Sequence, residues 1–132
     1  MKIRCCPSVQ LGERRGWSRR IFVQDAQGQN VPAYELMCQA IDNDIQTAEG
    51  SGAATLKALA LVEKGESEKE ELGGNAWYTY INQDKVWFEG QYSQGEGGEV
   101  SFAQYKLAVQ TYVRFLADPE HRPIEVPFPD GA

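Results

Sequence analysis

The stretch 75–92, NAWYTYINQDKVWFEGQY, decides the fold that this 132-residue sequence predicts. Residues 75–82 and 85–92 are rich in aromatic and β-branched side chains, which favour strands. Only Gln83 and Asp84 separate the two segments, and a two-residue connection joins antiparallel neighbours. The stretch therefore predicts a β-hairpin, although Gln-Asp is not a favoured pair for such a turn.

The pairing around this turn gives the hairpin two different faces. Alternation places five mostly apolar side chains on a natural core face: Trp77, Thr79, Ile81, Val86 and Phe88. The opposite face carries Tyr78, Tyr80, Trp87 and Glu89. Tyr and Trp beside an acidic group are typical of binding surfaces, because the rings bury area and keep a polar atom available. The alternative is that N-terminal strands or residues 124–128 cover this face.

A helix is expected on the C-terminal side of the hairpin. Residues 93–99 predict a glycine-rich loop, and Ser101 is a candidate N-cap for the helix that follows. The helix extends to Leu116 and ends before Asp118-Pro119. Its amphipathic stripe consists of Phe102, Tyr105, Val109, Tyr112, Val113 and Leu116. Pro127 within the alternating segment 124–128, with Pro123 just before it, favours an extended tail or an edge strand.

Two more helices and several short strands are expected on the N-terminal side. Residues 66–72, ESEKEEL, taken alone suggest a loop or helix, but their position just before two strands favours an exposed edge strand. The Ala/Leu-rich segment 53–64 predicts a helix with Gly65 at its C′ position. A helix of about four turns begins near Pro32 and ends at 50–52, because apolar residues recur at helical spacing. These apolar residues are Tyr34, Met37, Ile41 and Ile45. Ile3, Cys5 and residues 20–24 predict short strands.

Together these segments predict one α+β domain that spans residues 1–132. It has a small antiparallel sheet with a central hairpin, and two to three amphipathic helices packed on one face of that sheet. Hydrophobic residues make up 42% of the chain and charged residues 24%, which is typical of a globular protein. No apolar run approaches the roughly 18 residues of a membrane span, and the N-terminus has no apolar signal core. We therefore expect a cytoplasmic protein without a membrane partner.

The charges are unevenly distributed. Residues 1–20 hold six basic residues and one acidic residue, a net charge of +5. The other 112 residues hold seven basic and 18 acidic residues, a net charge of −11, so the whole chain carries −6. An acidic body repels nucleic-acid phosphates. The basic stretch either binds nucleic acid or forms strands whose arginines pair with the acidic body, and the second interpretation is preferred.

Few residues suggest catalysis. His121 is the only histidine, and it lies in a predicted loop. Cys5 and Cys6 are neighbours, a spacing that rarely gives a relaxed disulfide, and Cys38 is a candidate core residue. Metal-binding motifs such as CxxC or HExxH do not occur. Paired carboxylates are expected to be exposed and therefore poor acid–base catalysts: Asp42/Asp44, Glu66/Glu68 and Glu70/Glu71. We expect no enzyme activity, catalytic residue, metal or cofactor.

Residues 53–117 also carry a family resemblance. The pattern comprises Gly65-Glu66, then Gly74-Asn75-Ala76-Trp77, Ile81 and Asp84-Lys85-Val86-Trp87-Phe88, followed by a helix that begins at Ser101. This pattern resembles small immunity proteins of bacterial polymorphic toxin systems, including those of the contact-dependent growth inhibition type. The resemblance implies a cytoplasmic protein that binds one cognate toxin domain and blocks its active site. It implies no catalysis.

Charge and resemblance together suggest how such a protein would bind. Many of these toxins are nucleases, and an acidic inhibitor can be steered into a basic substrate cleft. The candidate partner-binding residues are Tyr78, Tyr80, Trp87, Glu89, Glu66, Glu68, Glu70, Glu71, Glu96 and Glu99. Two alternatives stay open: a small-molecule-binding or regulatory domain that uses the hairpin face, and an enzyme that uses His121 with a cysteine or carboxylate. The oligomeric state is not predicted.

Overall fold

A computed structural model describes residues 1–9 and 17–131 of the chain. Its helices are α1 (Glu35–Asp44), α2 (Ala53–Glu63) and α3 (Phe102–Ala117). A 3₁₀ turn (Pro32–Tyr34) precedes α1, and a π-helical turn (Ala48–Gly52) precedes α2. The strands are β1 (Lys2–Val9), β2 (Trp17–Gln24), β3 (Glu70–Gly73), β4 (Trp77–Ile81), β5 (Lys85–Gly90), β6 (Glu96–Ser101) and β7 (Ile124–Pro127).

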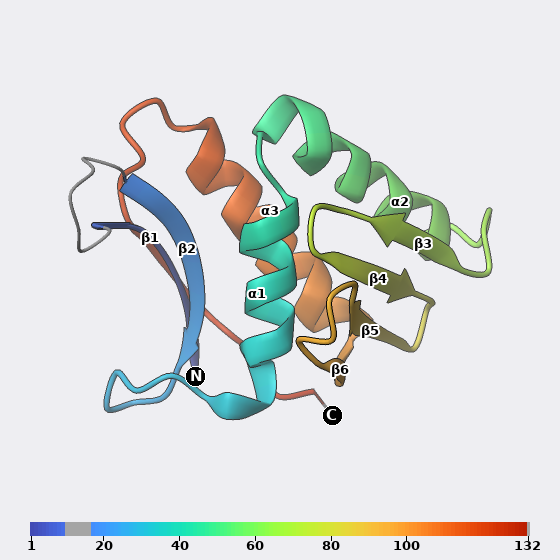
Figure 1. Cartoon of the computed structure of the whole chain (residues 1–132), viewed down its shortest axis with the longest axis horizontal. Helices are drawn as coiled ribbons and strands as arrows, with labels where there is room; N and C mark the ends of the chain where they lie inside the picture. The colour runs from blue at the N-terminus through green and yellow to red at the C-terminus, as the bar shows by residue number, and fades with distance from the viewer. Residues whose placement is uncertain (10–16, 132) are drawn as a thin grey trace.

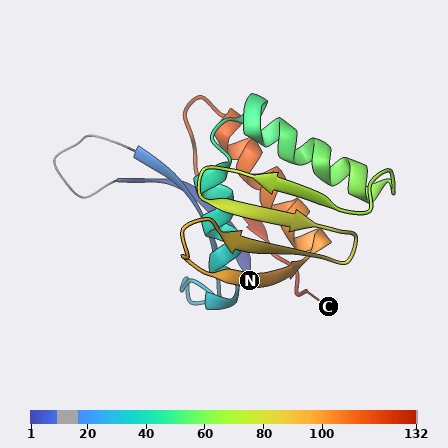
Figure 2. The same cartoon turned by 45° about the vertical axis from the view of Figure 1, so that its right-hand side comes forward.

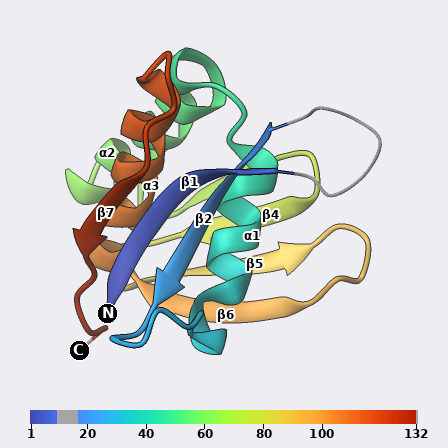
Figure 3. The same ribbon diagram turned by 90° about the vertical axis from the view of Figure 1, so that its left-hand side faces the viewer.

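The strands form two antiparallel sheets, so the predicted α+β class is confirmed. One sheet has the strand order β2-β1-β7 and the other β3-β4-β5-β6. Helices α1 and α3 contact strands of both sheets and lie between them, while α2 packs on α3 beside β3 (Figure 1). Figure 3 shows β1, β2 and β7 on the side of the helices away from β4, β5 and β6. The helices therefore have apolar residues to bury in two directions.

The hairpin has the predicted register. Tyr80 pairs with Trp87 and Tyr78 with Glu89, although β4 and β5 are shorter than the predicted strands. The Asn82 side chain accepts hydrogen bonds from the amides of Asp84 and Lys85, at 2.8 and 2.9 Å. An Asx turn of this kind stabilises a connection that lacks the preferred turn residues.

The glycine-rich segment is not the loop that the sequence predicts, because β6 begins within it at Glu96. The register shifts between Val86 and Phe88, so β6 carries a bulge opposite the hairpin. Gly98 has a φ of 59°, and a Cβ atom there would lie 2.7 Å from the Cβ atom of Leu36 on α1. Only glycine allows both this backbone conformation and this close contact with the helix.

The first helix is shorter than predicted, because α1 ends at Asp44 and not at 50–52. Ile45 is extended, and its side chain is buried. After it, Thr47 Oγ1 accepts a hydrogen bond from the Gly50 amide and Ser51 Oγ from the Gln46 amide. These side chains compete with helix hydrogen bonds and form the π-helical turn that leads into α2.

The C-terminal helix matches its prediction closely. Ser101 caps α3, and its hydroxyl and the Gln104 side chain make the two reciprocal bonds of a capping box. Val109 is fully buried, and the ring of Tyr105 lies 5.8 Å from that of Phe88 on β5. The helix therefore packs on the predicted core face of the hairpin.

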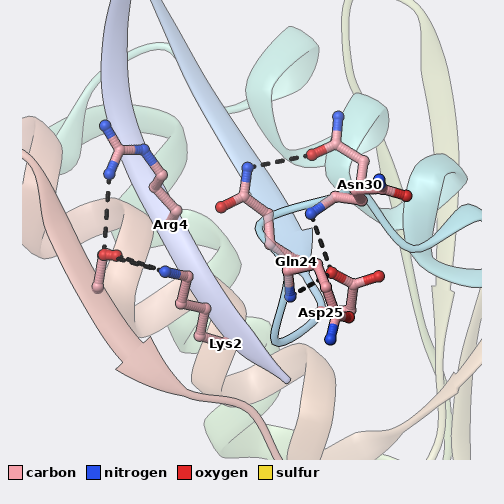
Figure 4. Close-up of polar contacts among 8 residues, drawn as sticks. Lys2, Arg4, Gln24, Asp25 and Asn30 are labelled. Carbon is pink, nitrogen blue, oxygen red and sulfur yellow. Dashed lines mark hydrogen bonds and ion pairs between the residues drawn. The ribbon is translucent and has the colours of Figure 1, made fainter.

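Three of the described N-terminal basic residues, Lys2, Arg4 and Arg20, pair with acidic ones, while Arg19 donates a 3.4 Å hydrogen bond to the Gln46 carbonyl. Lys2 Nζ lies 2.9 Å from Glu125 on β7, and Arg4 lies 3.8 Å from the same carboxylate (Figure 4). Arg20 Nε lies 3.0 Å from Asp42 on α1. Because β7 pairs with β1 at the edge of the sheet, residues 124–127 are the edge strand that the alternation allows. Arg14 and Arg15 lie outside the described residues.

Among residues 1–9 and 17–131, no helix has the length and apolar character needed to cross a membrane.

Candidate binding surface

The four-stranded sheet has one face free of helices. In Figure 2 its strands lie in front of α1 and α3, and no helix or other strand of the described chain crosses them. We call this side the aromatic face and define it by Tyr78, Tyr80, Trp87 and the charged side chains around them. The strands that could have covered it, β1, β2 and β7, form the other sheet instead. The alternative of a covered hairpin face is therefore wrong.

Tyr80 and Trp87 form the centre of the aromatic face. Their rings stack at 5.5 Å between centroids with an interplanar angle of 20°. Both side chains are half-buried, and Tyr78 beside them is 44% exposed. The Tyr80 hydroxyl donates a 2.7 Å hydrogen bond to Glu89, and this bond raises the pKa of Tyr80 to about 12. The ring therefore stays neutral and holds the Glu89 carboxylate beside it.

Two lysines, which the sequence analysis did not include, also lie on this face. Lys69 Nζ is 5.2 Å from the centroid of the Tyr80 ring and 5.5 Å from that of Trp87. Lys85 Nζ is 5.1 Å from the Trp87 ring and pairs with Glu99 at 3.1 Å. Alternation from Trp87 could have placed Lys85 here, and alternation within the strand predicted at 66–72 could have placed Lys69 on the face of Glu71, although the observed β3 begins only at Glu70.

The predicted acidic residues do not all lie on the aromatic face. Glu71 pairs across the sheet with Tyr80, and Glu96 with Glu89, so these carboxylates share the face with the rings. Glu99 reaches the same face through its ion pair with Lys85.

The remaining predicted carboxylates lie elsewhere, so the predicted site is only partly assembled. Glu70 pairs with the buried Ile81, and it accepts a 2.7 Å hydrogen bond from Ser67. It therefore lies on the helix side of the sheet. Glu66 and Glu68 are exposed in the turn between α2 and β3, near the turn of the hairpin.

A hollow lies between β2 and α1. Its lining includes Asp42, one of the paired carboxylates that the sequence predicts to be exposed. Asp42 is buried there, with only 6% of its side chain exposed. It accepts hydrogen bonds from Arg20 Nε at 3.0 Å and from the Ile21 amide at 3.5 Å. Burial raises the pKa of Asp42 to about 6, although Arg20 and the Ile21 amide lower it. The one-turn spacing of Asp42 from Cys38 allows this position, but the burial comes from β2, which packs on α1 and leaves no signal in the helix sequence.

Asp44 is also more buried than expected, and its role is structural. Its carboxylate accepts a 2.9 Å hydrogen bond from the Ala76 amide at the start of β4. Burial raises the pKa of Asp44, and hydrogen bonds from the amides of residues 75–77 oppose this shift. The side chain therefore joins the end of α1 to the turn before β4.

The residues considered for catalysis are His121 and three cysteines, two of which are buried thiols. His121 lies in the turn after α3, with its ring 5.6 Å from that of Phe115 in an edge-on contact. Cys5, Cys6 and Cys38 are free thiols. Burial raises the pKa of Cys5, and it raises the pKa of Cys38 to about 12. Thiolates, the reactive form, are therefore scarce at neutral pH at these two positions. Within the described part of the chain, no group of three or more His, Cys, Asp or Glu residues could hold a metal ion.

Searches for similar proteins found no match among protein-family models, curated proteins or solved structures.

Proposed function

We propose that this protein binds and inhibits a cognate toxin domain, as immunity proteins do, and that the aromatic face is the surface that contacts the toxin. The observation that carries the proposal is the stacked Tyr80–Trp87 pair on an uncovered sheet face. Large aromatic side chains at the centre of an interface usually supply most of the binding energy. Here they lie on regular strands, so little conformational entropy is lost when a partner binds.

The charged groups around the rings favour binding of a partner with a basic surface. The carboxylates of Glu71, Glu89, Glu96 and Glu99 outnumber the ammonium groups of Lys69 and Lys85. Such a rim speeds association with a basic surface and disfavours phosphates. A nuclease toxin fits this chemistry, because its substrate cleft is basic. The resemblance of residues 53–117 to immunity proteins adds a cytoplasmic location and a non-catalytic mechanism to the proposal.

The proposal is tested with Trp87→Ala in a capture and inhibition assay. The wild-type protein is used to capture its partner from the native strain, and the partner is purified and identified. Because Trp87 is a central anchor, Trp87→Ala should dissociate faster and lose about 2 kcal/mol or more of binding free energy. The toxin should then stay active in a mixture that the wild-type protein inhibits.

Tyr92→Ala is the matched control. Tyr92 is 74% exposed in the turn between β5 and β6 and lies outside the stacked pair. Its removal should leave affinity and inhibition unchanged. A folded Trp87→Ala variant that binds and inhibits like the wild type would show that the aromatic face is not the site.

A small-molecule-binding or regulatory function is the second candidate, and the hollow between β2 and α1 is the observation in its favour. Polar and apolar side chains line this hollow together, including Arg20, Tyr34, Glu35 and Asp42. Ligand sites combine such linings. A metabolite screen by thermal shift tests it: a hit that raises the melting temperature of the wild type but not of Arg20→Ala would favour this function.

A further inference from the structure

A shallow hollow on the aromatic face has the features of a receptor for one particular side chain. Lys69, Tyr80, Trp87, Glu89, Glu96 and Gly97 line it, together with Phe88. The two rings form one wall, and the two glutamates lie directly opposite each other across β5 and β6. Gly97 borders open space, because a Cβ atom there would meet nothing within 4 Å.

The rings already attract cations. Lys69 Nζ lies within reach of both ring faces, and Lys85 Nζ lies over Trp87. Cation–π attraction of this kind is strongest for Trp. However, Lys69 pairs with Glu71 at 3.4 Å and Lys85 with Glu99, and neither ammonium forms an ion pair with the glutamates in the hollow.

Glu89 and Glu96 are short of positive charge. Glu89 accepts a hydrogen bond from the Tyr80 hydroxyl. Among the described residues, neither the Glu89 nor the Glu96 carboxylate has a Lys or Arg nitrogen within 4.0 Å. Like charges directly opposite each other destabilise a sheet. A cation supplied by a binding partner would relieve this repulsion, and in the same position it could form a cation–π contact with Trp87.

We propose that this hollow receives an arginine side chain of the protein partner, with its guanidinium stacked on Trp87 and hydrogen-bonded to Glu89 and Glu96. The proposal rests on the proposed function, because it specifies the partner's chemistry at the same surface. Guanidinium suits both parts of the hollow: it is planar and stacks on rings, and its fork of N–H donors matches carboxylate oxygens. An ammonium group has no plane to stack and donates less directionally.

The test uses three small probes with ¹⁵N-labelled protein: the N-acetyl methylamides of arginine, citrulline and lysine. Citrulline has nearly the shape of arginine but carries no charge. The arginine probe should shift the Trp87 indole signal and the amides of β5 and β6 in a saturable way. Citrulline and lysine should each bind at least about fivefold more weakly, the loss expected when one exposed charge-assisted contact of about 1 kcal/mol is missing.

Variants then locate the site. Glu89→Gln with Glu96→Gln should weaken binding of the arginine probe at least about fivefold, because it removes both charged partners and the loss of one such contact already costs about that much. Glu66→Gln with Glu68→Gln is the matched control, because it removes the same charge from the turn outside the hollow, and it should change nothing. Lys69→Ala should tighten binding, since it removes the internal cation that competes for the rings. Equal binding of arginine and citrulline, equal binding of arginine and lysine, or signal shifts elsewhere would each overturn the proposal.

The two proposals fail in different ways. If the arginine probe binds in the hollow while Trp87→Ala still captures and inhibits the toxin, the proposed interface is wrong, and the hollow is an arginine site that the toxin does not use. If Trp87→Ala abolishes inhibition while arginine and citrulline bind alike, the aromatic face is the interface and the arginine anchor is wrong.

Discussion

Replacing Asp42 by Asn should change how the stability of this protein depends on pH. The substitution removes a charge from a side chain that is 6% exposed. It keeps an oxygen that can accept the hydrogen bonds from Arg20 and the Ile21 amide. The pKa of Asp42 is raised from 3.8 to about 6, mainly because burial penalises the charged form. At neutral pH the ionised carboxylate is therefore a net cost to folding, in spite of its ion pair.

Proton linkage gives the sign and size of the effect of Asp42 on the free energy of unfolding. The folded state binds the Asp42 proton more tightly than the unfolded state, so this group lowers the free energy of unfolding as pH rises from about 4 to 6. A shift of about two pKa units corresponds to about 3 kcal/mol over the full range. Between about pH 5 and pH 7.5 the wild type should lose about 1.4 kcal/mol through this group, and Asp42→Asn should not.

Urea unfolding followed by tryptophan fluorescence at the two pH values measures the difference. Comparing the pH dependence of the variant with that of the wild type cancels the other titrating groups, which both proteins share. Asp84→Asn is the control, because it removes an exposed carboxylate from the hairpin turn and should keep the wild-type pH dependence. The reasoning is refuted if Asp42→Asn and the wild type show the same pH dependence, or if the variant is clearly less stable than the wild type at pH 7.5.

Three further outcomes are expected. Val109→Asp should unfold the domain, because it buries an unpaired charge at a fully buried position of α3 at a cost of about 3 kcal/mol or more; its exposed neighbour Gln110 offers the control Gln110→Asp, and equal thermal melts would contradict the packing described. Glu71→Lys should slow association with a basic toxin at low salt more than Glu70→Lys does, since only Glu71 shares a face with the rings; equal association rates would exclude steering by this face. A broad substrate screen should show no hydrolytic or transferase turnover, and turnover that disappears in His121→Ala would overturn the non-catalytic assignment.

The sequence alone determined the features that depend on neighbouring residues. A two-residue connection between two alternating strands set the hairpin register, which brings Tyr80 opposite Trp87. The Ser101 cap and the apolar stripe of α3 followed from local hydrogen bonds and helical periodicity. Alternation within the strand predicted at 66–72 also implies that Glu70 and Glu71 point to opposite faces of the sheet, as they do in the structure.

Only the tertiary structure decided which faces are covered and which charges are buried. The N-terminal strands and residues 124–127 pair with each other across the chain and form a second sheet, which leaves the hairpin face open. Contacts between residues so distant in sequence leave no periodic pattern. Asp42 shows the consequence most clearly: its helix predicts a polar residue at the surface, but β2 packs over it, and Arg20 and the Ile21 amide make its burial possible.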